Sequence, residues 1–568
     1  MKELAQVASR PVAAEMPPSA AESGAARVPA SAGRLSRLPA AALVVAVLAG
    51  LLHLVPYWRA QSQTPEGWTF TGNLYRSPDF MQYRVWLRQS QGHGVVVPNK
   101  FTAEANQPYI PVFYYYAVGA VSRWLGKTPE FVLAHAASLI AGVLVLLLFV
   151  TVRLFLPSPR QHWWVFFAIL AGGGLGAHIK LLRQFEVLQN SPVVMRLLFE
   201  PVESWLVFED YRGHYVFLTL FDPHFLVIWL ATAAAVVSLY LALRRPTWTR
   251  FGLLALLDAA ATLLHVYEGV TLVAVTLATA MLCWRRRAAT RAAWTAVAVC
   301  AVSVGACCAW MMMLQQSSGV PAPVWRAVNI LFAILVISYP LAWAVIAWGL
   351  GRYWQQAGLE ECFLLGWILG CTALVLSGPF YPYPDRGTMT LQIPLYLAAG
   401  CMYFRRRPRL APRAALVAIL LLGATPGWAM MRLWRQGGFD PDAAYKFVNG
   451  SHRETVEILR RRAGAADLLA AEPEDLLWLA PEYPGKHYSG HFFWTVKYDR
   501  KQAALLRFFE AAPEEQAAFL RREGIRFLFV GPRHNVNRLR EIPGLVPLKT
   551  TAVGALFEYR DGTSSSSN

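Results

Sequence analysis

The sequence predicts an α-helical polytopic membrane protein with about eleven transmembrane helices and a small C-terminal α/β domain. Of its 568 residues, 55% are hydrophobic and only 15% are charged, and the mean hydropathy is +0.34. A soluble globular protein carries roughly a quarter charged residues. Apolar runs of about twenty residues, long enough to cross a bilayer core, recur along the chain with short arginine clusters between them. Most of the chain is therefore expected in lipid.

The N-terminal segment differs from the apolar part that follows it. Residues 1–36 are rich in Ala, Ser and Pro, which predicts a disordered cytoplasmic tail. The run Leu38 to Tyr57 is long for the core of a cleaved signal peptide and has no clear small-residue cleavage site. We interpret it as a retained signal anchor, the first helix of a transmembrane domain over residues 37–432.

Arginine clusters predict the orientation of the helices. Later spans are predicted near 130–154, 162–180, 222–243, 251–267, 268–284, 292–313, 325–349, 360–378, 391–404 and 414–432. With the N-terminus inside, every second connection is cytoplasmic. All five of these connections carry arginine: Arg153 and Arg160; Arg244, Arg245 and Arg250; Arg285, Arg286, Arg287 and Arg291; Arg352; and Arg405, Arg406, Arg407, Arg409 and Arg413. This arrangement satisfies the positive-inside rule.

The orientation requires that residues 108–124, PYIPVFYYYAVGAVSRW, do not span the membrane. Counting them as a span would place every later arginine cluster outside. Their Pro, Tyr and Trp content is typical of a helix that lies in the membrane interface. The large loops 57–129 and 181–221 are then extracytoplasmic, and the protein is expected in the inner membrane of a bacterium.

Residues 433–568 have a different, charged composition and are predicted to fold outside the membrane. SHRETVEILRRRAG and APEEQAAFLRREG are typical of helices, whereas IRFLFVG and VGALFEYR are typical of strands. A segment of about 130 residues is large enough for a hydrophobic core of its own. We therefore expect a small extracytoplasmic α/β domain.

The net charge of +18 does not indicate nucleic-acid binding, because the arginines lie in short clusters between apolar runs. Anionic lipid headgroups are the partners that this distribution favours. All seven cysteines fall in apolar segments, which predicts packing roles and no disulfide framework.

The first outer loop holds the most informative polar residues. A carboxylate at the membrane surface, beside helices that lie in the interface, suits chemistry on a lipid-linked substrate. A carboxylate can act as a base or bind a metal, and nearby cations can hold a phosphate. Asp79 is the candidate acid, although Ser-Pro-Asp is also a good helix-start signal, and Asp79 alternatively only caps a helix. The other candidate binding residues in this loop are Arg84, Lys100 and Glu104.

Two later outer segments add candidates. Asp-Pro-His at 222–224 opens a span, where a helix N-terminus can pair with anionic groups; Asp222 is alternatively the N-cap, with Pro223 at position N1. Glu203 is a further acid of the same loop. In PFYPYPDRGTMTLQIP (379–394), Arg386 is the only cation and can bind a phosphate bidentately. Its alternative role is a snorkelling anchor or a partner of Asp385.

The order of these features resembles the type C (GT-C) glycosyltransferases, which use polyprenyl-phosphate sugars and include the protein O-mannosyltransferases and the aminoarabinose transferases. The resemblance covers nearly the whole chain and is strongest to poorly characterised bacterial members. It is carried by Asp79, by QPYIPVFYYYAVGAVSRWLG and FVLAHAASLIAG, by PDRGTMTLQIPLYLAAG, and by YSGHFFWT and EGIRFLFVG in the tail. Each of these motifs is degenerate.

The resemblance implies an inverting transferase that moves a sugar from a polyprenyl-phosphate carrier to a lipid, glycan or protein acceptor. Asp79 takes the position of the family's first-loop catalytic acid and Arg386 that of a late-loop phosphate-binding arginine. Apart from the resemblance, His224 at the helix start 222–224 is a further candidate binding residue. The candidate cofactor is a divalent cation, Mg²⁺ or Mn²⁺, with Asp79 and Asp222 as its candidate ligands. The second loop departs from the pattern because it has no Asp-x-Asp signature; Asp222 or Glu203 is the substitute acid.

Two other classes of protein are weighed against this one. A transporter or flippase is favoured by Asp258, an acid inside a predicted span, but usually shows paired inverted repeats, and none is obvious here. A non-catalytic envelope assembly protein would use the C-terminal segment for binding. The large first loop argues against a transporter.

Overall fold

The computed structural model describes residues 38–175, 216–321, 338–377, 384–407 and 411–560, together with the single positions 178, 192, 335, 336 and 409. The predicted tail 1–36, most of the loop 181–221 and the candidate acid Glu203 lie outside the described residues. All described helices and strands belong to one compact unit that begins at Ala40.

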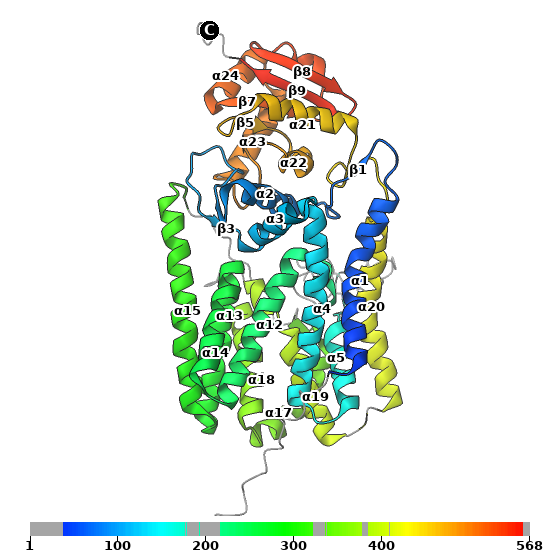
Figure 1. The fold of residues 1–568 in the computed structure, drawn as a ribbon, viewed down its shortest axis with the longest axis vertical. Coiled ribbons are helices and arrows are strands. Elements are labelled where there is room, and N and C mark those ends of the chain that lie inside the picture. The colour runs from blue at the N-terminus through cyan, green and yellow to red at the C-terminus, as the bar shows by residue number, and fades with distance from the viewer. Residues whose placement is uncertain are drawn as a thin grey trace, which may run out of the picture. The chain divides into compact units, whose positions relative to one another are not determined.

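Most of this unit is helical, and its long helices run side by side, with α2, α3 and the strands beyond one end of them (Figure 1). The helices before the C-terminal sheet are α1 (Ala40–Ser62), α2 (Pro78–His93), α3 (Phe113–Leu125), α4 (Pro129–Phe155), α5 (Pro159–Ala171), α11 (Val216–Thr219), α12 (Pro223–Arg244), α13 (Trp248–Leu264), α14 (Val266–Arg286), α15 (Thr290–Ser317), α17 (Pro340–Gln355), α18 (Leu359–Leu376), the 3₁₀ helix η3 (Pro384–Thr388), α19 (Gln392–Arg406) and α20 (Pro412–Gln436).

Among the described residues, six helices are long and apolar enough to cross a membrane: α1, α4, α12, α14, α15 and α18. Helices α5, α13, α17, α19 and α20 occupy the other predicted span positions. The count of about eleven spans stays a prediction. Of the predicted span 162–180, α5 covers the part up to Ala171 and residues 172–175 are not helical; beyond 175, only position 178 of this span is among the described residues. A Cβ atom at position 172 would lie 2.6 Å from the ring of Tyr396, which is too close. The backbone at the end of α5 therefore approaches Tyr396 at a position where glycine is required.

The arginine-bearing ends of several helices meet at one place. Arg286, at the end of α14, donates to the carbonyl of Gln355 at the end of α17 (2.9 Å). At the start of α18, Glu361 pairs with Arg405 of α19, and Tyr240 near the end of α12 donates to Glu360 (3.1 Å). Clusters that are far apart in the sequence therefore share one end of the helices, as the positive-inside pattern predicts.

The helix expected in the interface is α3, and it is short. At 1.5 Å per residue its 13 residues cover about 20 Å, less than the roughly 30 Å of a bilayer core. It ends at Gly126, whose left-handed backbone (φ 61°) closes the last turn. Its apolar residues divide between a buried face, which includes Tyr115 and Val118, and an exposed face, which includes Val121 and Trp124.

The C-terminal segment contains a five-stranded mixed sheet with the order β6-β5-β7-β9-β8. Strands β5 (Leu468–Ala470), β6 (Lys486–His487) and β7 (Ile525–Val530) are parallel; β9 (Gly554–Tyr559) runs antiparallel to β7 and to β8 (Leu545–Thr551). Two short antiparallel pairs contain strands of the first outer loop. Strand β1 (Thr69–Phe70) pairs with β4 (Phe447–Val448) of the C-terminal segment, and β2 (Val96–Val97) pairs with β3 (Ile110–Pro111) within the loop.

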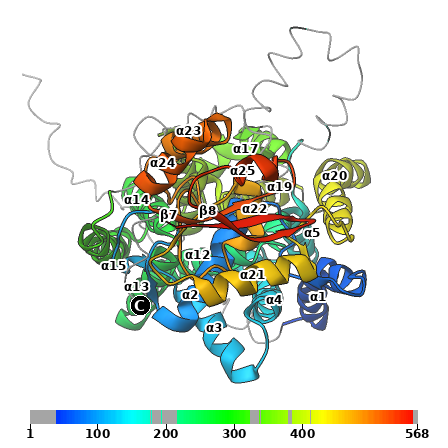
Figure 2. The same ribbon diagram turned by 90° about the horizontal axis from the view of Figure 1, so that it is seen from above.

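Helices cover both faces of this sheet, because alternate strand residues point to opposite sides. Phe527 and Phe529 pack with α21 (Gly450–Arg462) and α22 (Pro473–Leu479). Leu528 and Val530 pack with α23 (Tyr498–Glu510), α24 (Pro513–Glu523) and α25 (Val536–Leu539). Figure 2 shows α21 on one side of the strands and α23 and α24 on the other. Met81 of α2 belongs to the first core, and α2 contacts α22, so the helical layer on this face of the sheet packs against the helix that carries Asp79.

Candidate functional site

Asp79 lies in the first turn of α2, and it does not cap that helix. Ser77 is the N-cap: its hydroxyl accepts the Asp79 backbone N–H at 3.2 Å, and Pro78 takes the first helical position. The alternative that Asp79 serves only as a cap is therefore wrong. Its carboxylate lies 3.3 Å from Nε2 of His491, and its side chain is 53% exposed, so a ligand can reach it.

His491 comes from the C-terminal segment and is almost completely buried. Its Nδ1 accepts the backbone N–H of Phe493 at 3.1 Å. A ring nitrogen that accepts a hydrogen bond carries no proton, so the neutral tautomer has its proton on Nε2, which faces Asp79. The local sequence His-Phe-Phe thus orients the ring.

Backbone and side-chain contacts hold this segment against the first outer loop. Thr495 accepts the backbone N–H of His491 (3.1 Å) and donates to the carbonyl of Phe101 (2.6 Å). Asn99 donates to the carbonyl of Trp494 (2.8 Å), and the Trp494 indole donates to Gln82 on α2 (2.7 Å). Two segments almost 400 residues apart are therefore joined at the position where His491 meets Asp79.

The start of α12 supplies a second histidine. Asp222 caps α12, since its carboxylate accepts the backbone N–H groups of His224 (3.0 Å) and Phe225 (3.1 Å), and Asp222 is buried. The His224 ring stacks on Tyr83 of α2 with 4.3 Å between centroids, and its Nδ1 lies 3.0 Å from the hydroxyl of Tyr115 of α3. Asp222 therefore acts as the structural N-cap, and it positions His224 beside Tyr83, one turn after Asp79.

Arg386 completes the group from η3. Its guanidinium carbon lies 5.5 Å from the centroid of the Phe225 ring. Surrounding protein desolvates Asp79 and so raises its pKa, but the contact with His491 and the positive charge of Arg386 are among the causes that outweigh this effect. The pKa of Asp79 lies below its ordinary value, and the carboxylate is ionised at neutral pH. We call Asp79, Tyr83, Tyr115, His224, Arg386 and His491 the Asp79 cluster.

Three other predicted binding residues lie away from the Asp79 cluster and contact the C-terminal segment. Lys100 donates to the carbonyl of Pro484 (2.8 Å), and burial lowers its pKa to about 8. Glu104 pairs with Lys501 at 2.9 Å. Arg84 lies 3.4 Å from Glu482. These contacts join the first outer loop to the C-terminal segment.

Glu482 is the carboxylate that pairs with Arg84, and removing its charge should destabilise the fold. Its side chain, 16% exposed, contacts Arg84, Arg88 and Arg460. We expect Glu482→Gln to lower the free energy of unfolding by on the order of 3 kcal/mol, because the buried Arg84 guanidinium loses one of its two carboxylate partners. Thermal unfolding in detergent measures this loss. The control Glu457→Gln removes a carboxylate that is 52% exposed and should cost less than about 1 kcal/mol. Equal losses would contradict the prediction.

The same carboxylate predicts a pH dependence. Burial raises the pKa of Glu482, but the positive charges of Arg88, Arg84 and Arg460 lower it by more than burial raises it. The pKa of Glu482 therefore lies below its ordinary value. Its stabilising contribution is complete above the unfolded pKa, roughly 4.3, and is lost as the pH falls through the lower folded pKa.

The divalent cation stays a prediction, because the described residues show no complete ligand set for it. No group of three or more His, Cys, Asp or Glu side chains among them is arranged to hold a metal ion. Asp222 directs its carboxylate to the backbone of α12, and Glu203 lies outside the described residues. We therefore derive no step through Mg²⁺ or Mn²⁺.

Sequence reasoning missed the role of His491. The motif YSGHFFWT supported the resemblance, but no role was predicted for its histidine, because the C-terminal segment was treated as a separate domain. A histidine between small and aromatic residues in an otherwise charged segment was the available signal. Tyr115 was missed because the run FYYY gives no means of choosing among its tyrosines.

Comparison with known proteins identifies no family. No family model matches the sequence, and no curated protein matches it. One solved structure to which the chain is similar is that of the arabinofuranosyltransferase AftD from Mycobacteria, with a TM-score of 0.49 and 15% sequence identity. The match covers 93% of this chain but 40% of that one, so the chain spans less than half the length of AftD.

Proposed function

We propose that this protein is an integral membrane glycosyltransferase of the GT-C type, which moves a sugar from a polyprenyl-phosphate carrier to an acceptor on the outer face of a bacterial inner membrane. One observation carries the proposal: an accessible, ionised Asp79 lies close enough to Arg386 for the two charges to interact, beside the short helix α3. These are the base and the phosphate-binding cation that such a transfer requires.

In the proposed reaction, an acceptor hydroxyl attacks the anomeric carbon of the donor sugar. The bond between that carbon and the carrier phosphate oxygen breaks, and its electrons leave with the phosphate. Asp79 takes the proton of the attacking hydroxyl, and Arg386 binds the departing polyprenyl phosphate. Attack opposite the leaving group inverts the configuration at the anomeric carbon. His491 acts as a positioning residue, because it orients the Asp79 carboxylate and favours its ionised form.

Mass spectrometry of a deletion strain tests this function. Loss of the protein should remove one sugar from an envelope glycan, lipid or protein, and should leave a polyprenyl-phosphate sugar unused. Complementation with the wild-type chain should restore the sugar. Unchanged glycans and lipid-linked intermediates in the deletion strain would reject a transferase and favour a transporter or an assembly protein.

The outer-face assignment predicts a membrane topology. Reporter fusions should place residues 123–128 and the segment 433–568 outside, and residues 285–291 inside. The physical reason is the gathering of arginine-bearing helix ends opposite the end that carries α2 and α3. A cytoplasmic signal from the C-terminal segment would place the Asp79 cluster on the wrong face and reject the proposal.

His491 should set the acidic limb of the pH profile. His491→Phe keeps an aromatic ring but removes the contact that lowers the pKa of Asp79. The pKa of Asp79 should rise, so a larger fraction of it is protonated at mildly acidic pH, and the acidic limb of kcat/KM should move to higher pH. The control His534→Phe changes a histidine that pairs with Glu472 instead. An unmoved limb would show that His491 does not tune Asp79.

A further inference from the structure

A cavity lies on another face of α2, away from the Asp79 cluster. It has a volume of about 710 Å³ and lies between the facing ends of α1 and α4 and the helices α21 and α22 of the C-terminal segment. Arg84 and Arg88 line it, one helical turn apart. At 3.6 residues per turn, the side chains of Arg84 and Asp79 leave α2 in directions that differ by roughly 140° about the helix axis. Helix α2 is thus a wall shared by two sites.

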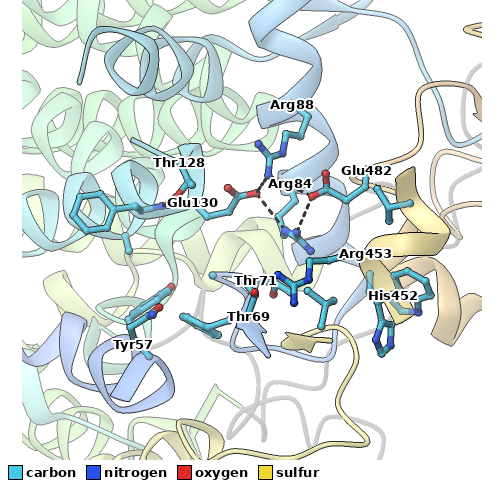
Figure 3. A pocket seen from close by; sticks show the side chains of 18 of the residues that line it. Tyr57, Thr69, Thr71, Arg84, Arg88, Thr128, Glu130, His452, Arg453 and Glu482 are labelled. Atoms are coloured by element: carbon cyan, nitrogen blue, oxygen red, sulfur yellow. Dashed lines mark hydrogen bonds and ion pairs between the residues drawn. The ribbon is translucent and has the colours of Figure 1, made fainter. Parts of the chain in front are cut away.

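Two arginines and two glutamates form the polar side of this cavity (Figure 3). Nη2 of Arg88 lies 3.0 Å from Oε1 of Glu130 and 3.3 Å from Oε1 of Glu482. Nη2 of Arg84 lies 3.4 Å from Glu482, and its Nε lies 3.6 Å from Glu130. The two carboxylates therefore bridge the same two guanidinium groups.

This network leaves hydrogen-bonding capacity unused. The Arg84 side chain is only 6% exposed, yet its Nη1 has no hydrogen-bond partner among the described residues. The same holds for Nε of Arg88, whereas Oε1 of Glu130 is ion-paired with both arginines. Buried donors are normally satisfied, so the two guanidinium groups retain donor capacity that the acceptor oxygens of a ligand can use.

The charge of the lining favours a neutral ligand. Four arginines and three glutamates line the cavity, the remaining ones being Arg453, Arg460 and Glu457. A phosphate would compete with Glu130 and Glu482 for the same guanidinium groups and would be repelled by both carboxylates. A neutral group with several hydroxyls pairs with guanidinium N–H and carboxylate oxygen without this repulsion.

The other walls present aromatic rings. Tyr57, Trp58 and Trp478 line the cavity, and Trp58 is 50% exposed at the end of α1. Large, rigid rings bind the apolar face of a ligand at little entropic cost, while polar groups fix its orientation. The volume lies within the roughly 300–1,000 Å³ of small-molecule sites.

We propose that this cavity binds a neutral saccharide, with Arg84, Arg88 and Glu130 on its hydroxyl groups and Trp58 against its ring face. The site lies apart from the Asp79 cluster, no member of which is among its described lining residues. The inference rests on the proposed function in one respect: a glycosyltransferase uses such a site to hold the glycan to which it adds a sugar.

Equilibrium binding tests the proposal without requiring transfer. Full-length Asp79→Asn protein in detergent is applied to an array of uncharged arabinan, mannan and galactan oligosaccharides, and calorimetry measures the affinity for each oligosaccharide that binds. At least one should bind, and adding Trp58→Ala should weaken it about tenfold through loss of ring contact. The matched control is Trp124→Ala, which removes a tryptophan that is 83% exposed on α3 and is not a lining residue; it should bind unchanged.

Several outcomes overturn the saccharide site. These are the absence of binding to every oligosaccharide, equal affinity in the Trp58 and Trp124 variants, and displacement of the oligosaccharide by inorganic phosphate or by phosphatidylglycerol nanodiscs. Each leaves the proposed function standing, because transfer is assayed separately with wild-type protein. Conversely, saccharide binding by a protein whose deletion leaves envelope glycans unchanged would retain the site and reject the transferase.

Discussion

Asp79→Asn is expected to abolish sugar transfer almost completely while leaving the protein folded and abundant in the membrane. Asparagine keeps the size of the side chain but cannot accept the proton of an acceptor hydroxyl. General-base assistance contributes roughly 10²–10⁴-fold, so kcat should fall by that factor. Because Ser77 caps α2, the substitution removes no helix cap, and stability should change little. Transfer from a polyprenyl-phosphate sugar in detergent or nanodiscs measures the effect.

The matched control is Asp442→Asn, which removes the charge of an exposed aspartate before β4 and should retain full activity. Wild-type activity in the Asp79 variant would reject Asp79 as the base. A fall in activity that is accompanied by loss of protein from the membrane would instead assign Asp79 a structural role. Abundance and thermal unfolding are therefore measured with the rate.

Arg386 is expected to have the next largest effect, on use of the donor. Arg386→Ala should weaken transition-state stabilisation by about 1.5–3 kcal/mol, which is roughly 10- to 150-fold in kcat/KM for the donor. Arg386→Lys should also be impaired. The guanidinium carbon lies 5.5 Å from the Phe225 ring centroid, and an ammonium group does not reproduce the bidentate contact of a guanidinium with phosphate.

Donor saturation curves for both variants decide between the two roles of Arg386. A snorkelling anchor needs only a cation at the headgroup level, so lysine would substitute fully. Equal donor KM in the lysine variant and the wild type would therefore reject phosphate binding. As a control, Arg76→Lys changes an exposed arginine on the first outer loop that pairs with Glu474, and it should leave donor use unaffected.

Periodicity and local signals in the sequence were sufficient for several elements. The apolar runs predicted α1, α4, α12 and α14 because each must cover a bilayer core with about twenty apolar residues. Ser-Pro-Asp and Asp-Pro-His predicted the starts of α2 and α12, since a cap and a following proline act within one turn. The segments IRFLFVG and VGALFEYR are strands β7 and β9.

The sequence alone therefore determined the class of the protein, the starts of the helices that carry Asp79 and His224, and the residue types needed for the proposed chemistry. Only the tertiary structure decided which of those residues meet. His491 contacts Asp79, and Glu482 contacts Arg84, across about 400 residues of chain. Capping and periodicity are interactions between neighbours in sequence, whereas these pairings depend on how the C-terminal segment packs against α2, and no local pattern encodes that packing.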